Sequence, residues 1–178
     1  YHLADKKPVA EYDPTAPPWY KQASETKDVI VSAPYVFAST KKLGITMARQ
    51  FDGGGQMAVV GGDISLEEII ALVKGIELRG DGFAFLATRD GKIVAHAQPD
   101  SALKPVGEIL PGFDMSILQS ADAKINLRES DIGGSRKYVV ASSISGTDWV
   151  LCAVVDKAVI LSPLQSLLWM LVLAGLGF

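Results

Sequence analysis

The chain of 178 residues can hold one ordinary domain or two small α/β modules, and its composition (48% hydrophobic, 21% charged) is that of a globular protein. A formal net charge of −3, with no basic stripe alternating with aromatic residues, gives no reason to expect a nucleic-acid partner. The single cysteine, Cys152, excludes an intrachain disulfide and a cysteine-rich zinc site. Because Cys152 lies in an apolar run, we expect a buried strand thiol.

The N-terminal part of the chain predicts three strands and two helices. Residues 1–28 are polar and rich in proline, so only a short helix, over 19–25 after Pro18, is expected there. Apolar segments separated by polar or glycine-rich turns then predict strands over 29–36, 43–51 and 57–64. A helix follows, because Ser65 and Glu68 have the spacing of a capping box and apolar residues recur after them at helical intervals.

The rest of the chain, before its C-terminal run, predicts five more strands around a short helical insertion. The strands are expected over 82–88, 92–98, 124–129, 137–144 and 148–155, and one or two short helices over 99–123. Short consecutive strands favour an α+β fold with antiparallel sheets over a parallel βαβ fold. A boundary near 78–81 divides the chain into modules over 1–80 and 81–157. The first looks incomplete, because three strands with so little helix cannot cover both faces of a sheet.

The C-terminal residues 158–178 form an apolar run, and no charged side chain follows Lys157. A membrane-spanning helix needs about 20 such residues, and the run is apolar on all faces rather than along one stripe. We therefore expect 158–178 to be the start of a transmembrane helix. The alternative is a buried C-terminal helix of a soluble domain.

No motif in the sequence predicts catalysis, a cofactor or a metal site. The glycine clusters 53–55 and 61–62 lack the lysine of a phosphate loop and open no helix, so hairpin turns and a close-packed strand explain them better. The histidines, His2 and His96, lie far apart and belong to no recognisable metal or triad pattern. We expect no enzyme activity.

A group of aromatic residues near the N-terminus is the candidate binding site. Its members, which all fall within 26 residues, are Tyr12, Trp19, Tyr20, Tyr35 and Phe37. Large amphipathic rings make good walls for a small-molecule pocket, because they combine apolar faces with polar edges. The alternative is a local hydrophobic cluster that pins a loop to the sheet.

Three stretches carry a resemblance to a known family. The first is YDPTAPPWY at 12–20 with SAPY at 32–35, the second is MAVVGGDISL at 57–66, and the third is GFAFLATRDGKIVAH at 82–96. In their order and spacing they resemble the double-Cache sensor domains of bacterial methyl-accepting chemotaxis receptors, and together they cover nearly all of the chain before the apolar run. The resemblance implies two PAS-like Cache modules with antiparallel sheets.

The family's architecture implies a role for each part of the chain. Residues 1–80 would be the C-terminal part of the membrane-distal module, which binds the ligand, and 81–157 the proximal module, which relays the change to the second transmembrane helix. The domain would lie in the periplasm, anchored in the bacterial inner membrane, and the full receptor would be a homodimer. A first transmembrane helix, a stalk helix and the front of the distal module would precede Tyr1.

The resemblance also predicts the ligand-binding residues and narrows the ligand. Amino-acid-binding members carry an arginine and an aspartate at the positions of Pro17 and Phe37, and a second ammonium-binding aspartate that matches Asp63. Proline cannot make the bidentate contact to a carboxylate that arginine provides. An anionic Asp63 among aromatic rings would favour a cation, at about 0.5–2 kcal/mol per ring contact. We therefore expect an amine or quaternary amine, bound by Tyr12, Trp19, Tyr20, Tyr35, Phe37 and Asp63.

Four alternatives stay open at this point. The divergent pocket could recognise an amino acid, or the domain could be the sensor half of a histidine kinase or diguanylate cyclase. The module could also be structural or adhesive, with the aromatic residues serving only as core. Asp63 itself could be a cap or turn residue before the helix.

Overall fold

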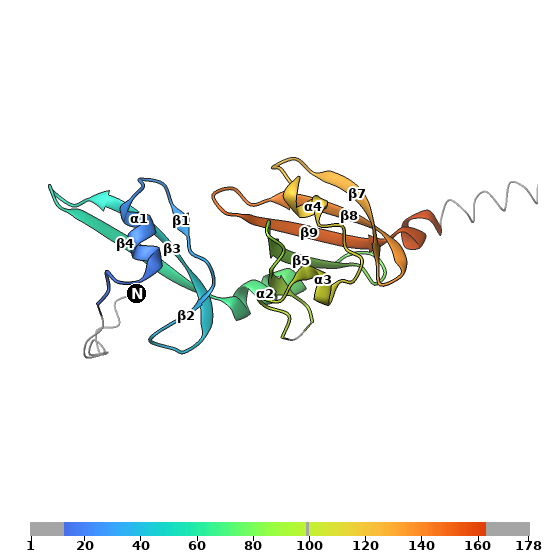
Figure 1. Ribbon diagram of the computed structural model, residues 1–178, viewed down its shortest axis with the longest axis horizontal. Coiled ribbons are helices and arrows are strands. Elements are labelled where there is room, and N and C mark those ends of the chain that lie inside the picture. The colour runs from blue at the N-terminus through green and yellow to red at the C-terminus, as the bar shows by residue number, and fades with distance from the viewer. Residues whose placement is uncertain (1–12, 99, 163–178) are drawn as a thin grey trace, which may run out of the picture. The chain divides into compact units, whose positions relative to one another are not determined.

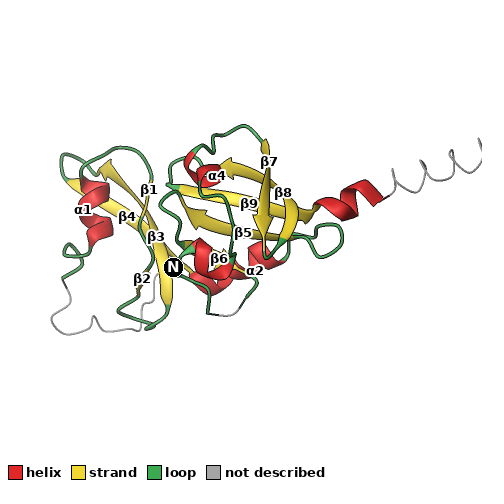
Figure 2. Ribbon diagram, turned by 45° about the vertical axis from the view of Figure 1, so that its right-hand side comes forward, coloured by secondary structure: helices red, strands yellow, loops and turns green. Residues whose placement is uncertain are grey.

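The computed structural model describes residues 13–98 and 100–162 (Figures 1 and 2). The chain separates into two compact units, Tyr1–Glu68 and Ile69–Phe178, and each unit has its own antiparallel sheet. The predicted α+β class with antiparallel sheets is therefore confirmed. The assignment of distal and proximal modules to 1–80 and 81–157 stays a prediction.

In the first unit, a long antiparallel ribbon of β3 (Leu43–Asp52) and β4 (Met57–Ser65) carries the other elements. The ribbon reverses at the expected glycine turn, where Gly54 and Gly55 have φ angles of 80° and 90° that other residues rarely adopt. The short strands β1 (Ile30–Val31) and β2 (Tyr35–Val36) both pair with β3. The helix α1 (Pro18–Ser24) begins at the predicted proline and packs on the ribbon (Figure 1).

The single strand expected over 29–36 is wrong in detail, because the segment forms the two strands β1 and β2 with an interruption at 32–34. Proline has no N–H to donate to a neighbouring strand and restricts the residue before it, so Pro34 breaks the ladder. Ser32 stays hydrogen-bonded to β3, since its N–H donates to the carbonyl of Thr46 and its hydroxyl accepts the N–H of Thr46, both at 3.0 Å. The interruption lets β2 approach β3 separately from β1, with Tyr35 opposite Gly44.

The helix α2 (Leu66–Lys74) starts where the capping-box spacing predicts. The N–H of Glu68 donates to the hydroxyl of Ser65 at 3.3 Å, which satisfies one of the free donors at the start of the helix. The buried side chains of this helix recur at the predicted helical spacing, and they include Leu66, Ile69 and Val73.

The second unit contains an antiparallel sheet with the strand order β6-β5-β9-β8-β7 in the described residues. Its elements are β5 (Phe83–Thr88), β6 (Ile93–His96), α3 (Val106–Ile109), α4 (Ser116–Gln119), β7 (Asn126–Ile132), β8 (Ser135–Ser143) and β9 (Trp149–Asp156). They match the predicted order, including the two short helices of the insertion. The sheet therefore follows from the alternation and turn signals of the sequence alone.

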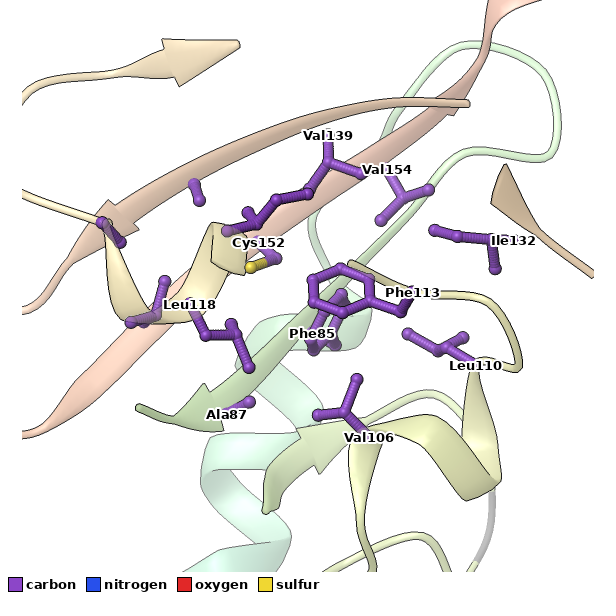
Figure 3. Packing of buried hydrophobic residues seen from close by; sticks show 14 of the residues in the cluster. Phe85, Ala87, Val106, Leu110, Phe113, Leu118, Ile132, Val139, Cys152 and Val154 are labelled. Carbon is purple, nitrogen blue, oxygen red and sulfur yellow. The ribbon is translucent and has the colours of Figure 1, made fainter. Parts of the chain in front are cut away.

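The core of the second unit lies between this sheet and the helical insertion (Figure 3). The rings of Phe85 and Phe113 meet edge to face, with centroids 5.5 Å apart. Cys152 is fully buried beside them, and burial raises the pKa of its thiol to about 12. The prediction of a buried strand thiol is confirmed, and a thiol with so high a pKa holds no reactive thiolate at neutral pH.

His96 ends β6 as a buried residue, and its ring lies at 5.3 Å from Phe83 and 6.3 Å from Phe85, centroid to centroid. Its Nδ1 accepts a hydrogen bond from the N–H of Gln98 at 2.9 Å, whereas its Nε2 is buried without a hydrogen-bond partner in the described part of the chain. Burial lowers the pKa of His96 below its ordinary value of 6.5. Burial therefore disfavours the charged imidazolium form in the folded state.

This burial predicts a loss of stability in mild acid. Because the unfolded chain takes up the proton more readily than the folded chain, the contribution of His96 to stability is complete above about pH 6.5. It falls as the pH drops below that value, by at most about 1.4 kcal/mol per pH unit. Urea unfolding at pH 7.5 and 5.5 should show a smaller pH dependence for His96→Phe than for the unchanged chain. Equal pH dependence in the two proteins would contradict the prediction.

The C-terminal end of the described chain is helical over 157–162. The carboxylate of Asp156 accepts the N–H of Ala158 at 2.8 Å and so caps this helix as it leaves β9. Within the residues described, no helix is long and apolar enough to cross a membrane. Most of the span predicted over 158–178 lies outside the described residues, and that span stays a prediction.

Candidate ligand-binding site

A hollow of about 370 Å³ lies in the first unit, beside α1 and β2. Its size is that of a small-molecule site. The residues that line it are Pro17, Trp19, Tyr35, Val36, Phe37, Ala38, Ser39 and Asp63. Aromatic side chains and a single carboxylate therefore dominate its walls.

Two glycines of the ribbon allow aromatic rings to lie directly on its backbone. A Cβ atom built on Gly61 would meet the indole of Trp19 at 3.2 Å, and one built on Gly44 would meet the ring of Phe37 at 2.2 Å. Both distances are shorter than ordinary carbon contacts. The expected close-packed strand at 61–62 is thus found at Gly61.

The remaining aromatic residues are arranged around these two rings. Tyr35 and Phe37 meet edge to face with centroids 5.2 Å apart, and Trp19 and Tyr20 do so at 5.9 Å. Such edge contacts fix the orientation of each ring. Phe37 is only 6% exposed, so it forms the floor of the hollow, whereas Trp19 and Tyr35 are half-buried at its sides.

Asp63 is the charged residue in the lining, and its carboxylate is hydrogen-bonded to a buried residue of the neighbouring strand. Antiparallel pairing sets Asp63 opposite Thr46, and the hydroxyl of Thr46 donates to Oδ1 of Asp63 at 2.6 Å. The hydroxyl of Tyr35 lies 2.6 Å from the same Thr46 oxygen. The carboxylate is therefore oriented by the sheet, and it gives the hollow a negative wall.

The structure brings together four of the six residues predicted for the site: Trp19, Tyr35, Phe37 and Asp63. Tyr20 is not among the lining residues but packs edge to face against Trp19. Tyr12 lies outside the described residues. Pro17, singled out as a replacement for arginine, also lines the hollow. Whether these residues bind a ligand stays a prediction.

Sequence reasoning missed Thr46, Gly44 and the role of Ser39 in the lining. The sequence held a signal for Thr46 and Gly44, because small residues occupy alternate positions on one face of the ribbon. In the register of the two strands, Gly44, Thr46 and Ala48 of β3 pair with Ser65, Asp63 and Gly61 of β4. A run of small side chains on one sheet face indicates that something bulky lies on it. Here the bulky groups are the indole of Trp19 and the ring of Phe37.

A second hollow, of about 620 Å³, lies at the far end of the ribbon. Its lining includes the exposed apolar residues Phe51, Met57 and Val60. Its arginine, Arg49, already donates through Nε to the carbonyl of Lys27 at 2.8 Å. We take the smaller hollow as the candidate site, because there the aromatic rings converge on a hydrogen-bonded carboxylate. In the described part of the chain, no three His, Cys, Asp or Glu residues could jointly hold a metal ion.

Comparison with known proteins assigns the family. The family model described as "Cache domain" matches residues 2–164, and the chain therefore belongs to the Cache domain family. This assignment agrees with the resemblance seen in the sequence, and the antiparallel α+β architecture is the one its solved relatives share.

Relatives of known name are bacterial chemoreceptors. The methyl-accepting chemotaxis protein PctB of Pseudomonas aeruginosa is 31% identical over 152 residues, which are 83% of this chain and 23% of PctB. PscA of Pseudomonas syringae is 30% identical over 152 residues, with the same coverage. The chain thus spans about a quarter of the length of these curated relatives.

The fold of this chain is similar to that of solved ligand-binding domains of chemoreceptors. The domain of the chemoreceptor CtaA of Pseudomonas fluorescens in complex with L-serine superposes with a TM-score of 0.67 at 30% identity, over 87% of this chain and 66% of that one. The domain of PctC of Pseudomonas aeruginosa in complex with GABA gives a TM-score of 0.65 at 27% identity, over 86% and 67%. The chain is therefore similar in sequence and in fold to chemoreceptor sensor domains.

Proposed function

We propose that this chain is an extracytoplasmic sensor module of a chemotaxis receptor, and that the hollow beside α1 and β2 binds a small cationic ligand, best an amine. The observation that carries the choice of ligand is the charge of the lining. Among the described residues, Asp63 is the one carboxylate of the lining, and no arginine, lysine or histidine stands beside it there. An amine finds a partner for its charge in such a site, whereas the described residues of the lining offer a carboxylate none.

The two replaced positions support this choice. The family's amino-acid-binding members carry an arginine where this chain has Pro17, and an aspartate where it has Phe37. Both residues line the hollow, and neither offers a charged or polar side-chain group. A ligand carboxylate would therefore lack the arginine, and among the described lining residues an ammonium group would have Asp63 as its one charged partner.

The aromatic walls add attraction for a cation. The face of an indole or phenol ring carries negative charge, which attracts an ammonium group by about 0.5–2 kcal/mol per contact. Trp19 and Tyr35 both line the hollow, so a ligand paired with Asp63 lies within reach of ring faces. A small organic amine supplies both the charge and an apolar body.

A second candidate is an amino acid recognised by a divergent pocket. The solved relatives favour it, since they include complexes with L-serine, GABA and L-arginine. Such a ligand would share the ammonium group with the first candidate. It would need a partner for its carboxylate other than Pro17.

A thermal-shift screen of the full chain separates the two candidates. We expect 10 mM butylamine to raise the melting temperature by several degrees, because a ligand at 100 times its Kd stabilises a protein by about 2.7 kcal/mol. Succinate should have no effect, and L-serine less effect than butylamine. Stabilisation by L-amino acids or organic acids but not by amines would overturn the proposed ligand class.

The proposed output is a signal that passes through β9 into the helix that follows it. Lys157 at the junction donates to Glu129 of β7 at 2.7 Å, and Lys137 of β8 pairs with Asp156 at 3.3 Å. These pairs tie the start of the helix to the sheet, so that a shift of the sheet would move the helix as a rigid body. Chemotaxis is favoured over a kinase or cyclase output by the curated relatives, which include PctB and PscA.

The remaining parts of the proposal follow from the same relatives and from the sequence. The helix would continue as a membrane anchor over 158–178, with the sensor module in the periplasm. The complete receptor would act as a homodimer. The module itself would bind its ligand without transforming it.

A further inference from the structure

Thr46 is the most deeply buried polar residue around the candidate site. It is 1% exposed and lies on β3, opposite Asp63. Its backbone N–H donates to the hydroxyl of Ser32 at 3.0 Å, and its carbonyl accepts the N–H of Ser32 at 3.0 Å. Its hydroxyl stands between Tyr35 and Asp63, at 2.6 Å from each. All of its polar groups are therefore in use.

The direction of this hydrogen-bond chain follows from the chemistry of its three members. An ionised carboxylate can only accept, so the single proton of the Thr46 hydroxyl goes to Oδ1 of Asp63. The Thr46 oxygen can then only accept from Tyr35, and the hydroxyl of Tyr35 must be the donor in that contact. The hydrogen bonds therefore run from Tyr35 through Thr46 to Asp63, and their donors and acceptors cannot be exchanged.

The packing around Thr46 holds its hydroxyl in this direction. Threonine is branched at Cβ, and its χ1 angle is restricted in a strand. Its methyl group Cγ2 lies against Gly61, where an added Cβ would meet it at 3.2 Å. A rotation that swapped the hydroxyl and the methyl group would break the bonds to both Tyr35 and Asp63.

We propose that Thr46 is a positioning residue, which orients Asp63 and fixes its carboxylate as a hydrogen-bond acceptor toward the ligand. This inference rests on the proposed function and narrows it. Oδ2 of Asp63 has no partner in the described part of the chain. A ligand with N–H donors matches this acceptor, so the site selects a primary ammonium over a quaternary one.

The test uses two probes of similar shape, butylammonium and butyltrimethylammonium, titrated by calorimetry into the full chain. The unchanged chain should bind butylammonium at least tenfold more tightly than butyltrimethylammonium. In Thr46→Val the side chain keeps nearly the same shape but has no hydroxyl. This variant should bind butylammonium about tenfold more weakly, as expected for a lost hydrogen bond to a charged group. Its affinity for the quaternary probe should change little. Thr46→Ser restores the hydroxyl and should restore the preference.

A measurement without ligand separates this inference from the proposed function. Three-bond NMR couplings across Cα–Cβ of Asp63 should report one rotamer in the unchanged chain and in Thr46→Ser, but an average of rotamers in Thr46→Val. If neither probe binds, the amine proposal fails while the couplings still decide the positioning role of Thr46. Equal binding of both probes would overturn the selectivity, and a single Asp63 rotamer in Thr46→Val would overturn the positioning role.

Discussion

Asp63→Asn should weaken the binding of a cationic ligand by about 10- to 100-fold and leave the fold intact. The amide has nearly the same shape as the carboxylate, and its oxygen can still accept the hydrogen bond that Thr46 donates at 2.6 Å. What is lost is the negative charge of the lining. A charge-assisted hydrogen bond is about twice as strong as a neutral one, and the aromatic walls alone cannot replace it. Calorimetric titration with butylammonium measures the change.

The matched control is Asp28→Asn, which removes the same charge from an exposed position of the same unit, outside the hollow. We expect this variant to bind butylammonium as the unchanged chain does, apart from a small long-range effect that salt screens. An equal loss of affinity in the two variants would mean that the ligand senses only the net charge of the unit. An unchanged affinity in Asp63→Asn would exclude Asp63 from the site.

Gly44→Ala should have the largest effect on stability in the first unit and should also alter the site. An added Cβ would lie 2.2 Å from the ring of Phe37 and 2.5 Å from the carbonyl oxygen of Ile64. The ring or the strand must therefore move, which costs about 3 kcal/mol at the upper end of the usual range for overpacking. Because Phe37 forms the floor of the hollow, ligand affinity should fall as well. Urea unfolding and calorimetric titration measure the two effects.

Gly62→Ala is the control for this prediction. Gly62 lies on the same ribbon, on the strand paired with β3, and a Cβ added there meets nothing within 4 Å. Alanine at this position should leave stability within about 0.5 kcal/mol of the unchanged chain, as surface substitutions usually do. If Gly44→Ala were as harmless as Gly62→Ala, Phe37 would not be packed against the strand, and the described floor of the hollow would be wrong.

The hollow gives a physical reason for phenylalanine and proline at positions 37 and 17, where the family resemblance implies an aspartate and an arginine. Phe37 extends an apolar floor where an aspartate would bring a second negative charge, and its ring lies edge to face with Tyr35 at 5.2 Å. Pro17 precedes the first residue of α1, where its backbone φ of −61° suits the entry into the helix. Proline at this position thus favours the start of α1 and offers no cation to the hollow.

The sequence predicted the strands, the turns and the short helices well, because each depends on local rules. Alternation over a few residues determines which faces of β8 and β9 are apolar, and glycines with positive φ determine where the ribbon reverses. The break at Pro34 was missed, although proline in a strand is itself a local signal. Cys152 was predicted correctly for the same local reason, since it sits in an apolar run.

The candidate site was only partly readable from the sequence. Trp19, Tyr35 and Asp63 could be chosen from residue type and family resemblance, but the contact of Asp63 with Thr46 depends on the register between β3 and β4. Register is a property of the paired strands, and a slip by one residue would turn Thr46 to the opposite face. Local residue patterns therefore determined the elements and the chemical character of this protein. The tertiary structure alone decided which groups meet, because the hydrogen bonds of the Thr46 hydroxyl join residues 11 and 17 positions apart.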